Sequence, residues 1–233
     1  MDTVDWLDLG EIGYDEALDI QLSLHGKCWR GLRRDIVIFQ RNEPLITCGV
    51  DSDRDHILWG DSLLREAGIA VREVQRGGGV TYHGPGQIIV SPLLRFTRYC
   101  RTAHLYLRAL EEVMIRLLGR FGVNAERVCG KSGVFVCCGA DGRRDKIASA
   151  GLSVSHGVTM HGMSLNIDPD MRHFEAIVAC GLYESGVTSL AALGCAVSYG
   201  QARDAWLEEF AGVFGVGVAR AGFPASTISD CKG

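Results

Sequence analysis

A glycine-rich stretch, residues 76–87 (RGGGVTYHGPGQ), constrains this chain more than any other part of its sequence. Five of its twelve residues are glycine, and it directly follows the β-prone run 69–74. Because glycine lacks a Cβ atom, it adopts positive φ easily and lets a ligand or another backbone approach the main-chain amides. The stretch therefore predicts a cradle for a ligand, and a glycine-rich hairpin without a ligand is the alternative.

The usual nucleotide-binding motifs do not fit this stretch. A Walker phosphate loop would read GxxxxGK followed by Ser or Thr, and a dinucleotide fingerprint would open a helix with GxGxxG. Here Val80, Thr81 and Tyr82 favour a strand, and Gln87 leads into the apolar residues 88–90. The pattern predicts a strand, a glycine-rich bend and a second strand.

Composition narrows the class of protein. The chain has 233 residues, of which 47% are hydrophobic, and it contains no repeat or linker-like tract, so we expect one domain over residues 1–233. Its net charge of -4 argues against nucleic-acid binding. No apolar run approaches the roughly 20 residues of a membrane helix, and the acidic start MDTVDWLDLGE does not resemble a signal or transit peptide. We expect a cytoplasmic protein.

The nine cysteines are odd in number and irregular in spacing, which favours reduced thiols over a disulfide framework. The sequence contains neither a CxxC pair nor histidines spaced to bind a metal. Cys137 and Cys138 are adjacent, and neighbouring strand residues point to opposite faces. We therefore expect no metal site.

Hydrophobic periodicity predicts the secondary structure. Helices are expected at 13–30, 62–67, 104–121 and 201–214, and strands at 35–40, 43–49, 133–138, 147–155, 158–160 and 163–167. The expected inner faces are Ala17, Leu18, Leu22 and Leu24 on the first helix, and Leu105, Leu107, Ala109, Leu110, Val113, Met114, Leu117 and Leu118 on the third. Pro44 suits an edge-like strand. Successive strands with helices largely to one side predict an α+β architecture with a mixed or antiparallel sheet.

Two residues carry further possible chemistry. Lys146, in DKIASAG, begins a predicted strand of small residues beside Gly151, although a lysine at a strand entrance is more often a solvated charge. Cys180 precedes a glycine, and a cysteine beside glycine can stand exposed at a turn, whereas a buried cysteine is usually inert. Neither residue is decisive alone.

Together, RGGGVTYHGPGQ, KIASAG, HGMSLNI and FEAIVACG resemble the lipoyl(octanoyl) transferase family, the octanoyl-acyl-carrier-protein:protein N-octanoyltransferases of the biotin and lipoate protein ligase fold. The resemblance runs in order over nearly the whole chain, from LGEIGYDEAL through EPLITCG to ACG. It implies transfer of an octanoyl group to the acceptor lysine of lipoyl domains through a cysteine thioester. It assigns the nucleophile to Cys180 and the lowering of the pKa of its thiol to Lys146.

The resemblance also implies the substrate contacts and the partners. The contacts fall on three segments: Arg76, Gly77, Gly78, Gly79, Val80, Thr81, Tyr82 and His83; Ser149, Ala150 and Gly151; and Gly162, Met163 and Ser164. The donor is octanoyl-acyl carrier protein, and the acceptors are the lipoyl domains of 2-oxoacid dehydrogenase E2 subunits and the glycine cleavage H protein. No cofactor is implied, because the acyl group arrives on the phosphopantetheine of the carrier, and we expect a monomer.

Three positions depart from the family pattern, and two other functions stay open. Gly79 stands where glutamine is frequent, Cys48-Gly49-Val50 replaces Leu-Gly-Arg, and Ala179 replaces a proline. An ATP-dependent lipoate or biotin ligase would share the fold but would not need a nucleophilic cysteine. A non-catalytic module that binds acyl carrier or lipoyl domains would keep the cradle and would not need Lys146.

Overall fold

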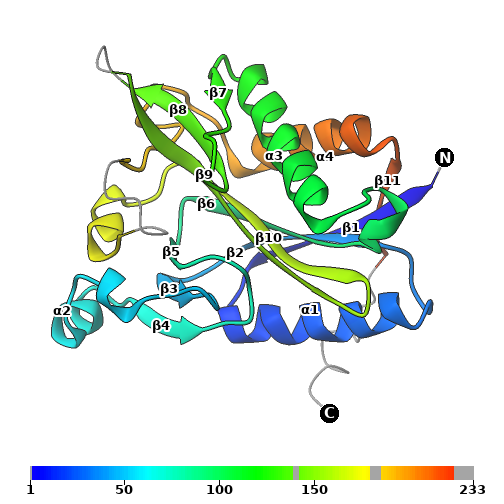
Figure 1. Ribbon diagram of the computed structural model, residues 1–233, viewed down its shortest axis with the longest axis horizontal. Coiled ribbons are helices and arrows are strands. Elements are labelled where there is room, and N and C mark those ends of the chain that lie inside the picture. Colours follow the sequence, from blue (N-terminus) through cyan, green and yellow to red (C-terminus); the bar gives the residue numbers. More distant parts are fainter. Residues whose placement is uncertain (1, 139–141, 179–184, 223–233) are drawn as a thin grey trace.

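An eight-stranded mixed sheet carries most of the fold of the computed structural model, which describes residues 2–138, 142–178 and 185–222 (Figure 1). Its strand order is β11-β1-β2-β6-β10-β9-β8-β7. The parallel part is β11 (Gly217–Arg220), β1 (Thr3–Glu11) and β2 (Ile36–Arg41). The antiparallel part continues from β2 through β6 (Gln87–Leu93), β10 (Val158–Asn166), β9 (Arg143–Ser155), β8 (Val134–Cys138) and β7 (Ala125–Glu126). The predicted α+β class with a mixed sheet is confirmed.

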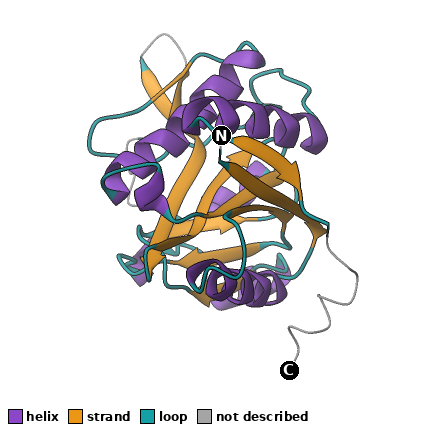
Figure 2. Ribbon diagram, turned by 90° about the vertical axis from the view of Figure 1, so that its right-hand side faces the viewer, coloured by secondary structure: helices purple, strands orange, loops and turns teal. Residues whose placement is uncertain are grey.

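Helices cover both faces of this sheet (Figures 1 and 2). On one face lie α3 (Ala103–Arg120) and α4 (Tyr199–Phe214), and α1 (Tyr14–Trp29) lies on the other. Strand β2 is buried on both faces. Its residues Val37 and Phe39 pack in the α3–α4 core, whereas Ile36 and Ile38 pack in the α1 core. A strand buried on both faces reads as a continuous apolar run, as this one does.

A smaller sheet packs beside the large one, with the order β4-β3-β5. Its strands are β4 (Ala70–Glu73), β3 (Leu45–Cys48) and β5 (Val80–His83), and its own core includes side chains of α2 (Asp61–Glu66) and of the 3-10 helix η3 (Met171–Ala176). Two further 3-10 helices are η1 (Arg54–His56) and η2 (Phe96–Arg98). The edge position expected for β3 is wrong, because β3 lies between β4 and β5 and Pro44 precedes it.

The predicted helices are confirmed to within one or two residues, but two of the expected inner positions are wrong. Leu22 is 51% exposed and Leu105 is 50% exposed, whereas the polar Gln21 and Glu111 are buried. Each of these polar side chains has a partner inside the protein, which makes its burial possible. The hydrophobicity pattern of the sequence could not reveal that these two polar side chains have such partners.

The two strands predicted at 158–160 and 163–167 form one continuous strand, β10. His161 and Gly162 look like a turn in the sequence but lie inside the strand. His161 has φ 58°, and a Cβ atom on Gly162 would lie 2.2 Å from the carbonyl oxygen of Val90. The glycine therefore serves close packing against β6 rather than a reversal of the chain.

The antiparallel register lines up residues across four strands. Gln40 of β2 is opposite Ile89 of β6, Ile89 is opposite Ser164 of β10, and Ser164 is opposite Ser149 of β9. Two residues further along each strand, the same face carries Ile38, Ser91, Gly162 and Gly151. Five residues of these two rows have small side chains or none, and they leave a hollow on the face toward α1: Ser91, Ser149, Gly151, Gly162 and Ser164.

Among the described residues, no helix is both long and apolar enough to cross a membrane.

We predict that Glu111 is a main contributor to stability. Its fully buried carboxylate accepts hydrogen bonds from Arg108 (2.6 Å) and from the amide of Gly133 (2.8 Å). Glu111→Leu leaves both donors without this partner and should lower the free energy of unfolding by about 3–5 kcal/mol in urea titrations. The control is Glu112→Leu on the same helix, whose side chain is 32% exposed; it should cost about 1 kcal/mol or less. Equal losses in the two variants would contradict this role for Glu111.

Candidate active site

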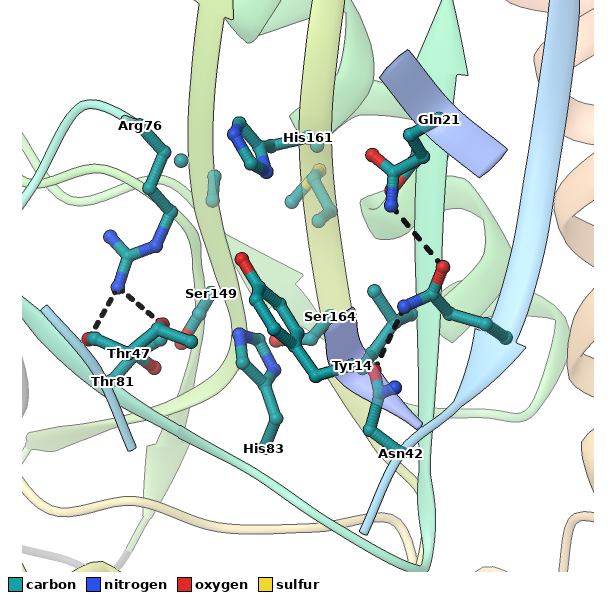
Figure 3. A pocket seen from close by; sticks show the side chains of 17 residues that line it. Tyr14, Gln21, Asn42, Thr47, Arg76, Thr81, His83, Ser149, His161 and Ser164 are labelled. Carbon is teal, nitrogen blue, oxygen red and sulfur yellow. Dashed lines mark hydrogen bonds between the residues drawn. The ribbon is translucent and has the colours of Figure 1, made fainter. Parts of the chain in front are cut away.

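A narrow cavity lies on these two rows of the large sheet, between the sheet and α1 (Figure 3). Its lining comes from seven elements or their flanks: α1, β2, β3, β5, β6, β9 and β10. Of the predicted substrate contacts, it brings together Arg76, Thr81, His83, Ser149, Ala150, Gly151, Gly162, Met163 and Ser164. The three predicted segments, far apart in sequence, therefore meet at one cavity.

Arg76 fixes one side of the cavity. It is 7% exposed, and its Nη2 donates to the carbonyl and hydroxyl oxygens of Thr47, both at 2.8 Å. Figure 3 shows these bonds beside the open space. Because the guanidinium stays charged at any physiological pH, this wall is permanently positive.

The glycines beside Arg76 allow three backbone segments to pack closely. A Cβ atom on Gly49 would lie 2.2 Å from the carbonyl oxygen of Gly78, and one on Gly151 would lie 2.8 Å from that of Gly77. The amide of Gly77 donates to the carbonyl of Leu152, and that of Gly78 donates to Asp51. Two amides of the predicted cradle thus form hydrogen bonds within the protein. Gly77, Gly78 and Gly79 do not themselves line the cavity.

The side chains of strand β5 alternate between the cavity and the core of the small sheet. Thr81 and His83 face the cavity, whereas Val80 and Tyr82 join the core of the small sheet, as alternation in a strand requires. The hydroxyl of Tyr82 lies 2.8 Å from Nδ1 of His173 in η3, and burial raises the pKa of Tyr82. Tyr82 therefore connects the glycine-rich segment to the helix that precedes residue 178, away from the cavity.

Two histidines face the cavity in their neutral form. Burial and, to a smaller extent, the nearby positive charge of Arg76 together lower the pKa of His83 to about 3 and that of His161 to about 4. Within the described part of the chain, Nδ1 of His83 is buried and has no hydrogen-bond partner. A neutral, partly unsatisfied imidazole can bind a polar group of a ligand but is a weak base.

Lys146 is buried, with 2% exposure, so it is not the solvated charge that its sequence position alone suggested. The β8–β9 register shifts by one residue here: Ala148 pairs with Val134, and Lys146 pairs with Phe135. The extra residue, Ile147, reverses the alternation, so Lys146 comes to the same face of β9 as Ser149. Its Nζ lies 5.3 Å from the centroid of the Phe135 ring. Lys146 is therefore adjacent to the row that contains Ser149, Ser164, Ile89 and Gln40, which lines the large-sheet side of the cavity.

Two segments hold the backbone around Lys146. Gly133, at φ +101°, approaches so closely that a Cβ atom would lie 2.4 Å from the carbonyl oxygen of Ala148 and 3.5 Å from Cε of Lys146. On the other side, the amide of Lys146 donates to Gly186 and its carbonyl accepts from Thr188. Asp145 adds a bond from the amide of Gly186 at 2.9 Å.

Cys180 lies outside the described residues. The described residues that flank it are anchored: the amide of Val178 donates to the carbonyl of His56, and Gly186 is bonded beside Lys146. The described chain thus ends at Val178 beside η1, and Gly186, after the gap, is bonded to Lys146 of β9.

Several residues that line the cavity were not predicted: Tyr14, Gln21, Gln40, Asn42, Thr47, Ile89 and Ser91, together with His161, whose role the sequence left ambiguous. One signal was present. Gln40 is the last residue of the predicted apolar strand 35–40 and Asn42 lies two residues beyond it, and a polar side chain buried at either position needs a hydrogen-bond partner.

In the described ranges, no group of three or more His, Cys, Asp or Glu side chains could hold a metal ion.

Comparison with known proteins identifies close relatives of this chain. The family model for the lipoyl protein ligase A/B catalytic domain matches residues 13–211. An octanoyltransferase from Gloeobacter violaceus is 44% identical over 184 residues, which are 79% of this chain and 78% of that protein. One from Chloroflexus aggregans is 37% identical over 216 residues, covering 92% and 96%. Among solved structures, a putative lipoate protein ligase from T. acidophilum with bound lipoic acid has a TM-score of 0.76 at 15% identity, covering 100% of this chain and 94% of its own. This likeness concerns the fold.

The lowered histidine pKa values predict how stability depends on pH. As pH falls below about 6.5, both histidines take up protons in the unfolded state but not in the folded state. Stability should therefore fall between pH 6.5 and about 4. His83→Gln combined with His161→Gln should flatten this decline in urea unfolding curves at pH 7.0, 5.5 and 4.5. His104→Gln, on the exposed start of α3, serves as the control and should keep the wild-type slope. An unchanged slope in the double variant would contradict the prediction.

Proposed function

The chain belongs to the lipoyl protein ligase A/B catalytic-domain family, and from its octanoyltransferase relatives and the cavity beside Lys146 we propose that it transfers octanoyl groups to lipoyl domains. The donor is octanoyl-acyl carrier protein. The acceptors are lysines on the lipoyl domains of 2-oxoacid dehydrogenase E2 subunits and on the glycine cleavage H protein. The transfer is the first step of protein lipoylation made from endogenous octanoate.

The observation that carries this proposal is the buried Lys146, which lies on the same face of β9 as the cavity-lining Ser149. A lysine costs free energy to bury, so its placement on the cavity face favours a chemical role over a structural one. A free thiol is only a few per cent ionised at neutral pH, and a neighbouring ammonium raises that fraction. This supports Cys180 as a nucleophile activated by Lys146.

In the first half-reaction, the Cys180 thiolate attacks the carbonyl carbon of the octanoyl thioester. The bond from carbon to the phosphopantetheine sulfur breaks, and the leaving thiolate takes a proton from the ammonium of Lys146. The product is octanoyl-Cys180 with a neutral lysine beside it.

In the second half-reaction, the acceptor lysine attacks the acyl-enzyme as a free amine. Lys146, now neutral, takes the proton that the amine loses, and Cys180 leaves as a thiolate, which restores the initial ion pair. His83 is the other candidate base, but its pKa of about 3 makes it a poor one. Exchange of a thioester for an amide is favourable, so the reaction needs no ATP and no cofactor.

The oxyanion that forms in each half-reaction needs pre-aimed donors. The amides of Gly77 and Gly78 already donate within the protein. The remaining candidates are the amide of Gly79 and those of Ser149, Ala150 and Gly151, three consecutive residues of β9 that line the cavity.

The two rows of the large sheet would hold the acyl chain. Burying about six methylenes at roughly 0.8 kcal/mol each stabilises binding by about 5 kcal/mol. At that value per methylene, the binding affinities for acyl chains that differ by one methylene would differ about fourfold. We further propose that residues 1–233 act as one catalytic domain, as a monomer in the cytoplasm.

We predict a covalent intermediate. Incubation with octanoyl-acyl carrier protein, without ATP or acceptor, should add one octanoyl group, found on Cys180 by peptide mapping and discharged when a lipoyl domain is supplied. Cys180→Ser should abolish transfer, whereas Cys137→Ser, at an exposed thiol, should not. Absence of the adduct, with modification only after addition of ATP and free acid, would instead favour a ligase.

We also predict that Lys146 controls the Cys180 thiol. Lys146→Met removes a positive charge beside the thiolate, so the pH midpoint for alkylation of Cys180 should rise and both half-reactions should slow. Alkylation of Cys137, measured in the same samples by peptide mapping, is the internal reference. A midpoint that does not move would remove Lys146 from the mechanism.

A further inference from the structure

The side of the cavity formed by α1 and β2 is built from buried amide side chains. Gln21 of α1, Gln40 of β2 and Asn42 line it with exposures of 3%, 1% and 4%. Gln21 donates to Gln40 (3.3 Å), Gln40 donates to Asn42 (2.9 Å), and Asn42 donates to the carbonyl of Ile12 (2.9 Å). We call these three side chains the amide wall; Figure 3 shows its dashed bonds on the side of the cavity opposite Arg76.

The direction of this hydrogen-bond chain is fixed at its far end. The carbonyl of Ile12 can only accept, so Asn42 must present its NH2 group there and its Oδ1 to Gln40. Gln40 must then donate with Nε2, and Gln21 must donate to Oε1 of Gln40. The amide orientations follow from one another and leave Oε1 of Gln21 as the open acceptor of the chain.

That acceptor is buried. In the part of the chain that the structure describes, Oε1 of Gln21 has no hydrogen-bond partner. A buried acceptor without a donor is unfavourable, and native proteins rarely keep one without a use. A wall that served only a hydrocarbon chain would be built from apolar side chains.

The register of the sheet gives the separation between the amide wall and the proposed position of the acyl carbonyl. From Ser149 of β9 to Gln40 of β2 the row crosses three strand spacings of about 4.8 Å, or about 14 Å. An extended eight-carbon acyl chain spans roughly 9 Å, given carbon–carbon bonds of about 1.5 Å. A chain whose carbonyl lies between Lys146 and Ser149 therefore points its last carbons at Gln40 and Gln21.

We propose that the amide wall is a subsite for a hydroxyl group near the distal end of a medium-chain acyl group, with Oε1 of Gln21 as its acceptor. The protein then accepts hydroxylated octanoyl groups as well as octanoyl. The position of the acyl carbonyl, and so the direction of the chain, rests on the proposed function.

Binding of free acids tests the subsite without depending on transfer. Octanoic acid and 6-, 7- and 8-hydroxyoctanoic acid are titrated into the wild-type protein by calorimetry. At least one hydroxy acid should bind as tightly as octanoic acid or more tightly. In the Gln21→Leu variant, the affinity for that hydroxy acid should fall about fivefold relative to the affinity for octanoic acid, because one neutral hydrogen bond is lost.

Two further variants make the result specific. Gln21→Leu combined with Gln40→Leu removes both amides, so a compensating movement of Gln40 cannot hide the effect. Leu22→Ala changes the neighbouring, exposed face of α1 and should leave the ratio of affinities unchanged. Thermal unfolding establishes that each variant is folded.

The subsite is overturned if no hydroxy acid binds the wild-type protein at millimolar concentration, or if both Gln21 variants keep the wild-type ratio. The proposed function fails separately, when octanoyl-acyl carrier protein leaves no adduct on Cys180. A Gln21-dependent preference without such an adduct would keep the subsite and reject the transferase.

Discussion

The antiparallel register of β2, β6, β10 and β9 is the constraint on which the site depends. It places Gln40, Ile89, Ser164 and Ser149 in one row and leaves small residues in the row beside it. A shift of one residue would turn every one of these side chains to the α3–α4 core. Because Gly162 has no Cβ atom, β10 can approach the carbonyl of Val90 in β6, which fixes that register at the middle of the row.

A one-residue bulge in β9 is a second feature of this sheet on which the site depends. The extra residue at Ile147 turns Lys146 to the cavity face, while Ile147, Ala148 and Ala150 still pack against the helical core. Glu111 supports this arrangement from within α3, because its carboxylate binds the amide of Gly133, and Gly133 packs against Lys146 and Ala148. The burial of one lysine thus draws on a network of buried polar contacts well away from the cavity.

Charge and polarity differ between the two ends of the cavity. Arg76 and the neutral histidines His83 and His161 lie on one side, and the amide wall lies on the other. A shared fold does not fix which group a cavity binds. The choice rests with individual side chains on a common set of strands.

The sequence alone determined the motifs, the α+β class, the approximate helices and nine of the residues that line the cavity, because glycine density, hydrophobic periodicity and ordered family motifs are local signals. Only the tertiary structure decided which side of each strand a residue faces. Tyr82 turns away from the cavity beside Thr81 and His83, and Gln21 turns inward beside the exposed Leu22. Where both faces of a strand are buried, alternation in hydrophobicity disappears from the sequence. A one-residue bulge, such as that at Ile147, leaves no mark in composition, and a buried polar side chain is predictable only when its partner, distant in sequence, is known.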